Sequence, residues 1–222
     1  MAKTIITTVT VPATIHDLTT LKTVKSSLAI TGVADDSFLA RTIAQCSEAV
    51  GQECNRVFAL ETVEDTVFLQ GDGYPHLLTG GLPVLQLSRW PIVAVTSVTE
   101  DGTNLTAGTD FILDPTNGRL IRLHCDGRPR RWCAASVVAT YQAGYVLPGD
   151  TTGAARTLPY DLEDAVCRLV ATRWAERRRD PFVVEESVVG VGSTKYVTAG
   201  PNGNMPPDVA DLLDNYRVPV TA

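Results

Sequence analysis

The three histidines and five cysteines are the residue types of this chain best suited to bind a metal or attack a substrate. His124 and Cys125 are adjacent, and Cys133 follows eight residues later. A structural zinc site needs four matched ligands, usually including a Cys-x-x-Cys pair, and the sequence offers neither. We interpret His124 as a strand-end residue beside a buried thiol, with Cys125 on the opposite face of the strand. The sequence therefore predicts no metal, no cofactor and no catalytic nucleophile here.

Other segments resemble catalytic or phosphate-binding motifs only superficially. The glycine-rich segment 190–195 lacks the Gly-Lys-Ser/Thr order of a phosphate-binding loop, and we interpret it as a hairpin tip. Adjacent carboxylates diverge on a helix or strand, so helix caps and solvated faces explain the pairs Asp35-Asp36, Glu64-Asp65 and Glu185-Glu186. Neither a Gly-x-Ser-x-Gly elbow nor a His-Glu-x-x-His helix is present. We therefore expect a protein that is not an enzyme.

Three arginines near the end of a predicted helix are the candidates for contact with a neighbouring subunit or partner. Arg173, Arg177 and Arg178 could each bind a phosphate or carboxylate through a bidentate guanidinium. They could equally complement the negative end of the helix dipole and keep the surface solvated. The chain has a net charge of −6 and no basic stripe, so sequence-specific binding of DNA is not expected.

The composition is typical of a soluble globular protein, with 44% hydrophobic and 20% charged residues. No apolar run approaches the roughly 18 residues that a transmembrane helix needs, and we expect residues 1–11 not to act as a signal peptide. An odd number of scattered cysteines argues against a secreted disulfide framework. We therefore expect folding in a reducing cytosol and no membrane partner.

Helical periodicity appears at both ends of the chain. Apolar residues spaced by three and four predict one helix over 17–28, capped by Asp17, and a second from Asp35-Asp36 to about Val57. A long helix is predicted after Leu158-Pro159, with acidic residues in its first turn and arginines in its last. We expect this long helix to pack against the two N-terminal ones.

Between these helices the period changes to that of strands. Turn signals at Asp101-Gly102 and Asn117-Gly118 separate short apolar and β-branched runs. The strands are predicted at residues 62–69, 84–87, 92–99, 111–113, 120–123 and 137–142. Short strands with such turns indicate a small antiparallel sandwich or a barrel-like sheet.

The sequence thus predicts an α+β fold. Two N-terminal helices (15–59) and one long helix (157–180) form a small helical bundle, an antiparallel β module (60–148) is inserted between them, and a C-terminal extension (181–222) follows. The extension is predicted to hold a weak hairpin over 185–197, a linker over 198–207 and a short helix over 208–216. A helix of this length is marginal alone in water, so its apolar stripe must dock on its own domain or on a partner. That stripe consists of Val209, Leu212, Leu213 and Tyr216.

Several sequence segments, taken together and in their order along the chain, resemble those of a known family. They are Arg89 to Gly102, Asp110 to Arg122, Thr140 to Tyr145, Leu158 to Val170, Glu186-Ser187-Val188 with Tyr196, Pro206-Pro207, and Leu212-Leu213 with Tyr216-Arg217. As an ordered set they resemble the head–tail connector proteins of tailed bacteriophages, also called adaptor or head-completion proteins. The resemblance extends over residues 17–218.

This resemblance implies a structural virion protein in the neck, made and assembled in the cytoplasm of a host bacterium. Family members form rings, usually of twelve subunits, that join the portal to a stopper or tail-completion protein. Double-stranded DNA passes through the lumen during packaging and ejection, and an acidic protein suits such a channel because basic contacts would retard the DNA. The family's C-terminal segment extends toward the portal, which implies a portal interface at Val209, Leu212, Leu213, Tyr216 and Arg217.

Two alternatives remain open from the sequence. Another phage neck or tail ring protein, a stopper or a tail terminator, would be mostly β, which the helices disfavour. A β-rich module that binds a carbohydrate or peptide would need an exposed aromatic platform, and aromatic residues make up only 6% of the chain. Residues 1–14 and the Gly/Thr loop 149–156 depart from the family, and we expect each to be an added subunit contact or disordered.

Overall fold

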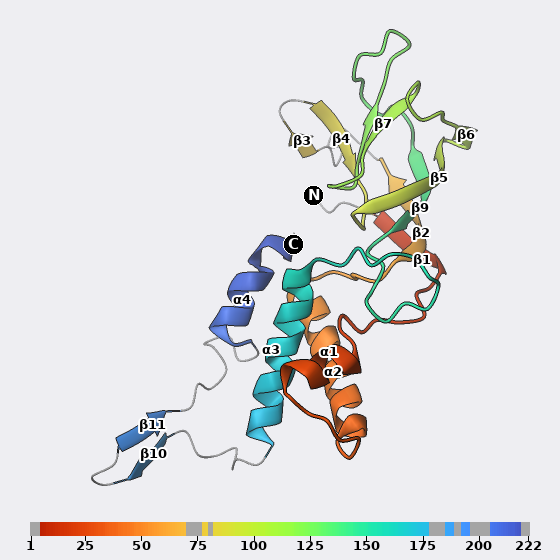
Figure 1. Cartoon of the computed structure of the whole chain (residues 1–222). Helices are drawn as coiled ribbons and strands as arrows, with labels where there is room; N and C mark the ends of the chain where they lie inside the picture. Colours follow the sequence, from red (N-terminus) through yellow and green to blue (C-terminus); the bar gives the residue numbers. More distant parts are fainter. Residues whose placement is uncertain are drawn as a thin grey trace. The chain divides into compact units, whose positions relative to one another are not determined.

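The computed structural model describes residues 5–69, 77–79, 82–177, 185–188, 192–195 and 205–218. The chain divides into two compact units (Figure 1). The β unit comprises Met1–Thr14 and Ala59–Tyr145, and the helical unit comprises Ile15–Phe58 and Val146–Thr221. Helices and antiparallel sheets thus occur in one chain, so the α+β prediction is confirmed. The β unit includes the N-terminal segment as well as the internal one.

The β unit contains two antiparallel sheets. One has five strands in the order β1-β2-β9-β5-β6, and the other has four in the order β3-β4-β8-β7. The strands are β1 (Ile5–Val11), β2 (Glu61–Phe68), β3 (Leu77–Thr79), β4 (Leu82–Gln86), β5 (Ile92–Glu100), β6 (Thr103–Asn104), β7 (Phe111–Asp114), β8 (Arg119–Arg122) and β9 (Ser136–Ala143). These bounds lie close to the predicted ones for β2, β5, β7, β8 and β9.

Side chains from both sheets form one hydrophobic core. Alternate residues of β2 and β9 are buried, which is the period of a sheet with one covered face. The buried cluster draws on both sheets and includes Val63, Val67, Leu85, Val98, Phe111, Leu120, Trp132, Val137 and Tyr141. The shared core is that of two packed sheets, as the alternation and turn signals predict.

The two predicted turns form where glycine supplies positive φ. Asp101 and Gly102 have φ of 47° and 79° between β5 and β6. Gly118 has φ of +65° in the turn between β7 and β8, and a Cβ there would lie 2.9 Å from the Cβ of Trp90. Both the backbone conformation and the close approach therefore favour glycine at position 118.

Strand β1 replaces the arm that was expected at residues 1–14. It pairs antiparallel with β2, from Ile5 opposite Val67 to Val9 opposite Val63. The Thr7 hydroxyl also donates to Asp65 Oδ1 at 2.7 Å. The expectation of a subunit contact or disorder did not include a strand, because the partner lies more than fifty residues away and local pattern does not show it.

The helical unit is built around one central helix. Helix α3 (Tyr160–Glu176) packs against α1 (Leu21–Ser27), α2 (Asp36–Glu53) and α4 (Pro207–Leu213), and a 3₁₀ turn, η1 (Asp214–Tyr216), follows α4. The predicted packing of the long helix against the two N-terminal helices is confirmed. Their buried faces carry the predicted apolar residues, among them Val24, Leu39, Ile43, Cys46, Val50, Leu162, Val166, Leu169 and Val170.

Two predicted details of the helix ends are wrong, and a third is only partly right. The N-cap of α1 is Thr20, whose hydroxyl accepts from the Thr23 N–H at 3.1 Å, and not Asp17. Asp17 lies outside the helix, where burial raises the pKa of its carboxyl despite the opposing charge of His16. Asp35 occupies the N-cap position of α2 as predicted, but its side chain makes no capping hydrogen bond. Helix α2 ends at Glu53, so Val57 lies beyond its stripe and is exposed.

The C-terminal extension contains the predicted hairpin and short helix. Strands β10 (Glu185–Val188) and β11 (Gly192–Lys195) pair antiparallel, with Glu185 opposite Lys195. Residues 189–191 of the hairpin, and the linker residues 198–204, lie outside the described residues. Helix α4 and η1 together span the predicted 208–216 helix.

Candidate functional site

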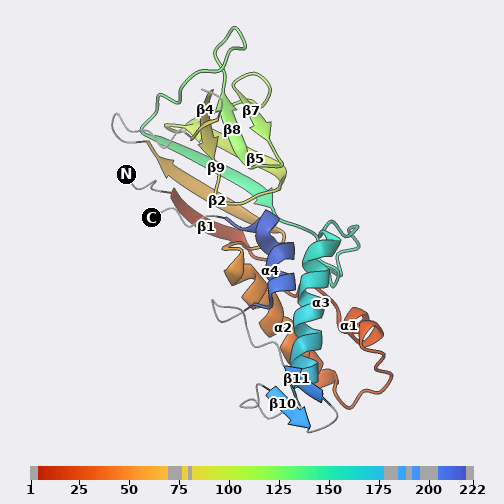
Figure 2. The same cartoon turned by 90° about the vertical axis from the view of Figure 1, so that its left-hand side faces the viewer.

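The apolar stripe of α4 docks on its own unit. Val209 and Leu213 are completely buried, whereas Leu212 and Tyr216 are half-buried. Helix α4 lies alongside α3 (Figure 2). The Tyr216 ring meets the edge of the Phe58 ring with centroids 6.4 Å apart. Of the two docking places that the sequence left open, the structure therefore shows the one within the chain.

Arg217 fastens the end of this segment to α2. Its Nη2 donates to Glu53 Oε1 at 2.5 Å, and its Nη1 donates to Asp214 Oδ1 at 3.0 Å. The Val218 N–H also donates to the Cys54 carbonyl at 3.0 Å. The chain from α4 to Val218 is thus held by burial at one end and by hydrogen bonds at the other.

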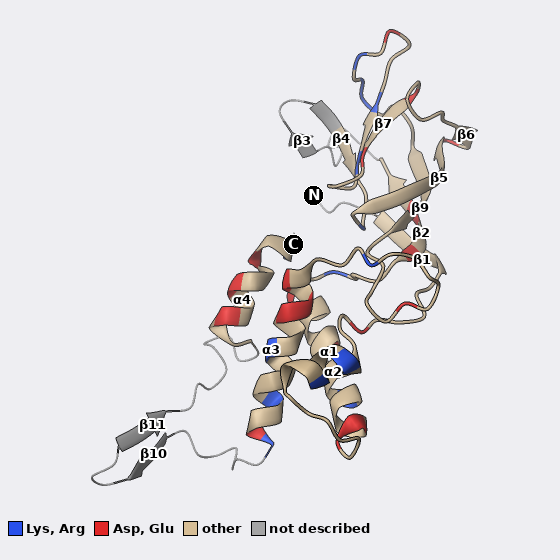
Figure 3. Cartoon of the chain, viewed as in Figure 1, with Lys and Arg blue, Asp and Glu red and all other residues tan. Residues whose placement is uncertain are grey.

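The outward surface of α4 and η1 is acidic, a feature that was not predicted from the sequence. Asp208, Asp211 and Asp214 recur every three residues and are exposed. Arg168 of α3 bridges Asp164, at 2.8 Å, and Asp208, at 3.4 Å. The hydrogen bond and charge of Asp164 raise the pKa of Arg168. Figure 3 shows acidic residues along α4 and at the start of α3. The three-residue spacing of the aspartates was the signal that could have revealed this face.

Two of the three candidate arginines hold α3 against α2. The Arg177 guanidinium pairs with Asp35 at 2.5 Å and lies 5.1 Å from the Phe38 ring centroid and 4.9 Å from that of Trp174. Arg173 donates to Gln45 Oε1 at 3.5 Å. These contacts join the start and middle of α2 to the end of α3. Arg178 lies outside the described residues.

The expected separation of His124 and Cys125 is wrong, because the segment is a loop rather than a strand. Cys125 is exposed, and its Sγ lies 3.2 Å from His124 Nδ1. Asp126 Oδ1 lies 3.4 Å from the same nitrogen. A catalytic triad uses the two ring nitrogens separately, one for the nucleophile and one for the carboxylate. These three side chains therefore do not form a triad, and no metal-binding group of three ligands exists in the described part of the chain.

Asp65 is a buried hydrogen-bonding centre, not the solvated carboxylate that its sequence neighbourhood predicted. It is 0% exposed and accepts from the Ser88 N–H and hydroxyl, each at 2.7 Å, and from the Tyr141 hydroxyl at 2.6 Å. Burial, then the charge of Asp65, raises the pKa of Tyr141. Close by, Arg89 forms an ion pair with the buried Glu61. This network links β1, β2, β9 and the segment after β4, so its role is to hold the sheet together.

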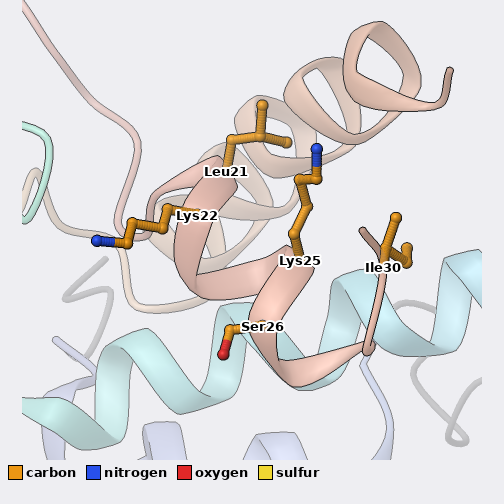
Figure 4. A pocket seen from close by; sticks show the side chains of 5 residues that line it. All are labelled: Leu21, Lys22, Lys25, Ser26 and Ile30. Carbon is orange, nitrogen blue, oxygen red and sulfur yellow. The ribbon is translucent and has the colours of Figure 1, made fainter. Parts of the chain in front are cut away.

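A shallow hollow lies over α1 in the helical unit (Figure 4). Its lining consists of Leu21, Lys22, Lys25, Ser26 and Ile30. Lys25 is already paired with Asp36 at 2.7 Å. The Lys22 side chain points away from the Lys25 side chain (Figure 4). The lining of the hollow contains neither a histidine nor a carboxylate that could activate Ser26 as a nucleophile.

No family model matches the chain, and no curated protein matches its sequence. A chain in the neck of an empty gene transfer agent particle, computed with C6 symmetry, matches its fold with a TM-score of 0.53 and 17% identity over 98% of this chain and 97% of that one. The fold is shared with a neck chain of a gene transfer agent.

A second match agrees with the first. A chain in the virion of a native gene transfer agent particle has a TM-score of 0.53 and 17% identity, covering 97% of both chains. The match extends over nearly the whole length of both chains. Within the described residues, none of the helices is long and apolar enough to cross a membrane.

Alkaline pH should destabilise the helical unit through a buried thiol. Burial raises the pKa of Cys54 from 9.0 to about 11, despite the opposing charges of Arg56 and Arg217. The unfolded chain releases this proton at lower pH than the folded chain, so the free energy of unfolding falls as pH rises above 9. The loss should reach up to about 3 kcal/mol at high pH.

Urea unfolding followed across this pH range measures the effect. Cys54→Val should reduce the alkaline decline, whereas Cys125→Val, which changes an exposed thiol, should leave it unchanged. An identical decline in Cys54→Val and the unmodified chain would contradict the assignment.

Proposed function

We propose that this protein is a structural subunit of the neck of a tailed, phage-like particle, where copies of it form a ring. The observation that carries the proposal is the fold match to a neck chain over 98% of the sequence. A neck ring needs a rigid subunit with surfaces for its neighbours, and each of the two units has its own buried core. The role is structural and not enzymatic, in keeping with side chains that assemble networks rather than a reaction centre.

Within the neck we assign the chain to the adaptor position, between the portal and the stopper or tail-completion protein. The ordered segments from Arg89 to Arg217 support this position, and by the same resemblance the ring holds twelve subunits. The helical unit favours an adaptor over a stopper or tail terminator, which are mostly β. Assembly takes place in the cytoplasm of the host bacterium, and the finished protein resides in the virion neck.

The portal contact is proposed to involve the outer side of the docked C-terminal segment. Leu212, Tyr216 and Arg217 keep exposed surface there. Val209 and Leu213 are buried beneath them and hold α4 in place. Arg173, Arg177 and Arg178 remain proposed as contacts with a neighbouring subunit, and for Arg177 the guanidinium remains partly exposed beside two aromatic rings.

Electrostatics support a passive role toward double-stranded DNA. The net charge of −6 disfavours tight contact with phosphates, and the exposed aspartates of α4 add local negative charge. DNA therefore passes through the lumen without sequence-specific recognition. A β-rich ligand-binding module is the weaker alternative, because the structure offers no exposed aromatic platform among the described residues.

Deleting the coding sequence from the genome that encodes this chain tests the function. The expected product is portal-containing, DNA-filled heads that lack both stopper and tail, and supplying the chain from a plasmid should restore complete particles. Electron microscopy and protein composition of the purified heads give the result. Heads that keep their stopper would contradict the adaptor position, and complete tailed particles without this chain would contradict any neck role.

A further inference from the structure

Strand β1 is a long, open edge of the five-stranded sheet. It has seven residues, and on one side it pairs with β2 while the other side has no partner strand among the described residues. In an antiparallel edge strand, alternate N–H and C=O groups point away from the sheet. Ile6 is 54% exposed and Val11 is 58% exposed. The edge therefore offers both backbone hydrogen-bonding groups and apolar side chains to a further strand.

This edge has few of the features that normally prevent strand addition. Ile5–Val11 contains only isoleucine, threonine and valine, with no charge and no proline. Its pairing with β2 is regular from Ile5 to Val9, and the register shifts only at the end of the strand, between Val9 and Val11. Natural sheets protect their edges with charges, proline, bulges or short strands, so a regular, uncharged edge of this length is expected to be covered in the assembled protein.

The other edges of the β unit carry such protection. Strand β5 is interrupted by two register shifts against β9, between Ile92 and Ala94 and between Val95 and Ser97, and β6 covers its end. In the second sheet, β3 has three residues, and β7 has four and ends at Asp114. The contrast makes β1 the site of strand addition.

The same chain contains a strand pair that lacks a third strand. Strands β10 and β11 form a sheet of two, and neither pairs with another described strand. Their register runs from Glu185 opposite Lys195 to Val188 opposite Gly192. An isolated two-stranded hairpin is marginally stable in water, and a third strand stabilises it. The hairpin would therefore be stabilised by a third strand, and the β1 edge has unpaired backbone groups that can bind one.

We propose that β1 of one copy pairs edge to edge with the β10–β11 hairpin of a second copy of this chain. Main-chain hydrogen bonds of the kind used in strand addition would form the contact. Because the two surfaces are different, each copy offers one of each, and the contact can repeat from copy to copy until a ring closes. This pairing would be the contact between neighbouring subunits of the proposed neck ring. Only the closure of the pairing into a ring rests on the proposed function.

Blocking the edge without harming the sheet is the first test. Thr8 lies opposite Glu64, so Thr8→Lys places a charge on the edge where it can pair with that carboxylate. Thr140→Lys is the matched control, because Thr140 lies opposite the same Glu64 but on β9, inside the sheet. Thr8→Lys should raise the dissociation constant for self-association at least about tenfold, whereas Thr140→Lys should leave it unchanged.

Sedimentation velocity and amide hydrogen exchange of the full chain supply the readouts. In the unmodified protein, raising the concentration should produce oligomers and slow the exchange of those β1 amides that are not bonded to β2. Equal self-association of Thr8→Lys and Thr140→Lys would overturn the inference. So would an unmodified chain that stays monomeric over the whole concentration range, whether or not its β1 amides are protected.

A complementation experiment identifies the hairpin as the partner. One variant carries Thr8→Lys and an intact hairpin, and the other keeps β1 but has residues 183–197 replaced by a glycine–serine linker. Each should be monomeric alone, and their mixture should form a one-to-one heterodimer by native mass spectrometry. Self-association of the hairpin-deleted variant, or a mixture that stays monomeric, would overturn the pairing.

The proposed function and this inference fail in different ways. If Thr8→Lys protein still builds complete necks, the inference is wrong and the neck role stands. If the unmodified chain is absent from necks, the neck role is wrong, whatever the β1 edge binds in solution.

Discussion

Replacing Asp65 with alanine should lower the free energy of unfolding of the β unit by about 3 kcal/mol or more. The carboxylate is fully buried and accepts hydrogen bonds from Thr7, Ser88 and Tyr141. Alanine leaves the Ser88 N–H and the Tyr141 hydroxyl without their acceptor inside the protein, and an orphaned buried donor is costly. The loss should spread over the strands that meet at this carboxylate, β1, β2 and β9.

Two control variants separate the network from the mere loss of an acid. Glu64→Ala removes the neighbouring carboxylate on the other face of β2 and should change stability by no more than about 0.5 kcal/mol. Asp65→Asn keeps one acceptor oxygen, so its free energy of unfolding should lie between those of Asp65→Ala and Glu64→Ala. Amide exchange in β2 and β9, measured alongside urea unfolding, assigns the loss to the β unit. Similar stabilities for Asp65→Ala and Glu64→Ala would contradict the role of the network.

Replacing Leu213 with alanine should destabilise the docked C-terminal segment by about 2–5 kcal/mol. Leu213 is completely buried in the helical unit. Removing its side chain leaves a cavity, and a helix as short as α4 does not persist in water without its packing. The amides of α4 should then exchange rapidly while those of α2 and α3 remain protected.

Leu212→Ala provides the comparison, because Leu212 is half-buried and adjacent. It should leave α4 docked but weaken attachment to the portal ring, whereas Leu213→Ala should lose both docking and attachment. Pull-down of the chain with portal rings and amide exchange report the two properties separately. Full portal attachment by Leu213→Ala would show that a docked α4 is not required for that contact.

The elements that could be predicted from the sequence are those whose apolar pattern repeats several times within one contiguous segment. Helices α2 and α3 have apolar stripes of several turns, and α3 also carries acidic residues in its first turn. Strand β9 buries every second residue, as the period of its strand predicts, whereas the buried face of β2 includes Asp65, which the sequence did not reveal. Gly118 identified its turn because only glycine readily adopts that φ.

What the sequence missed depends on contacts between distant segments. The threonines of β1 have no local pattern that reveals the partner strand, and Asp65 is buried only because Ser88 and Tyr141 converge on it. Thr20 rather than Asp17 caps α1, since capping requires a specific position relative to the first turn. For the candidate site, the apolar stripe of α4 was recognised. The sequence could not decide whether that stripe docks on α3 or on a partner protein.

The central claim is that this chain is a ring-forming subunit of a neck, and native mass spectrometry of the chain mixed with portal rings tests it most directly. We expect a single complex in which a portal ring carries a complete ring of this protein, with twelve copies, and end-on electron micrographs that show a second ring. A chain that remains monomeric and unbound beside intact portal rings would contradict it.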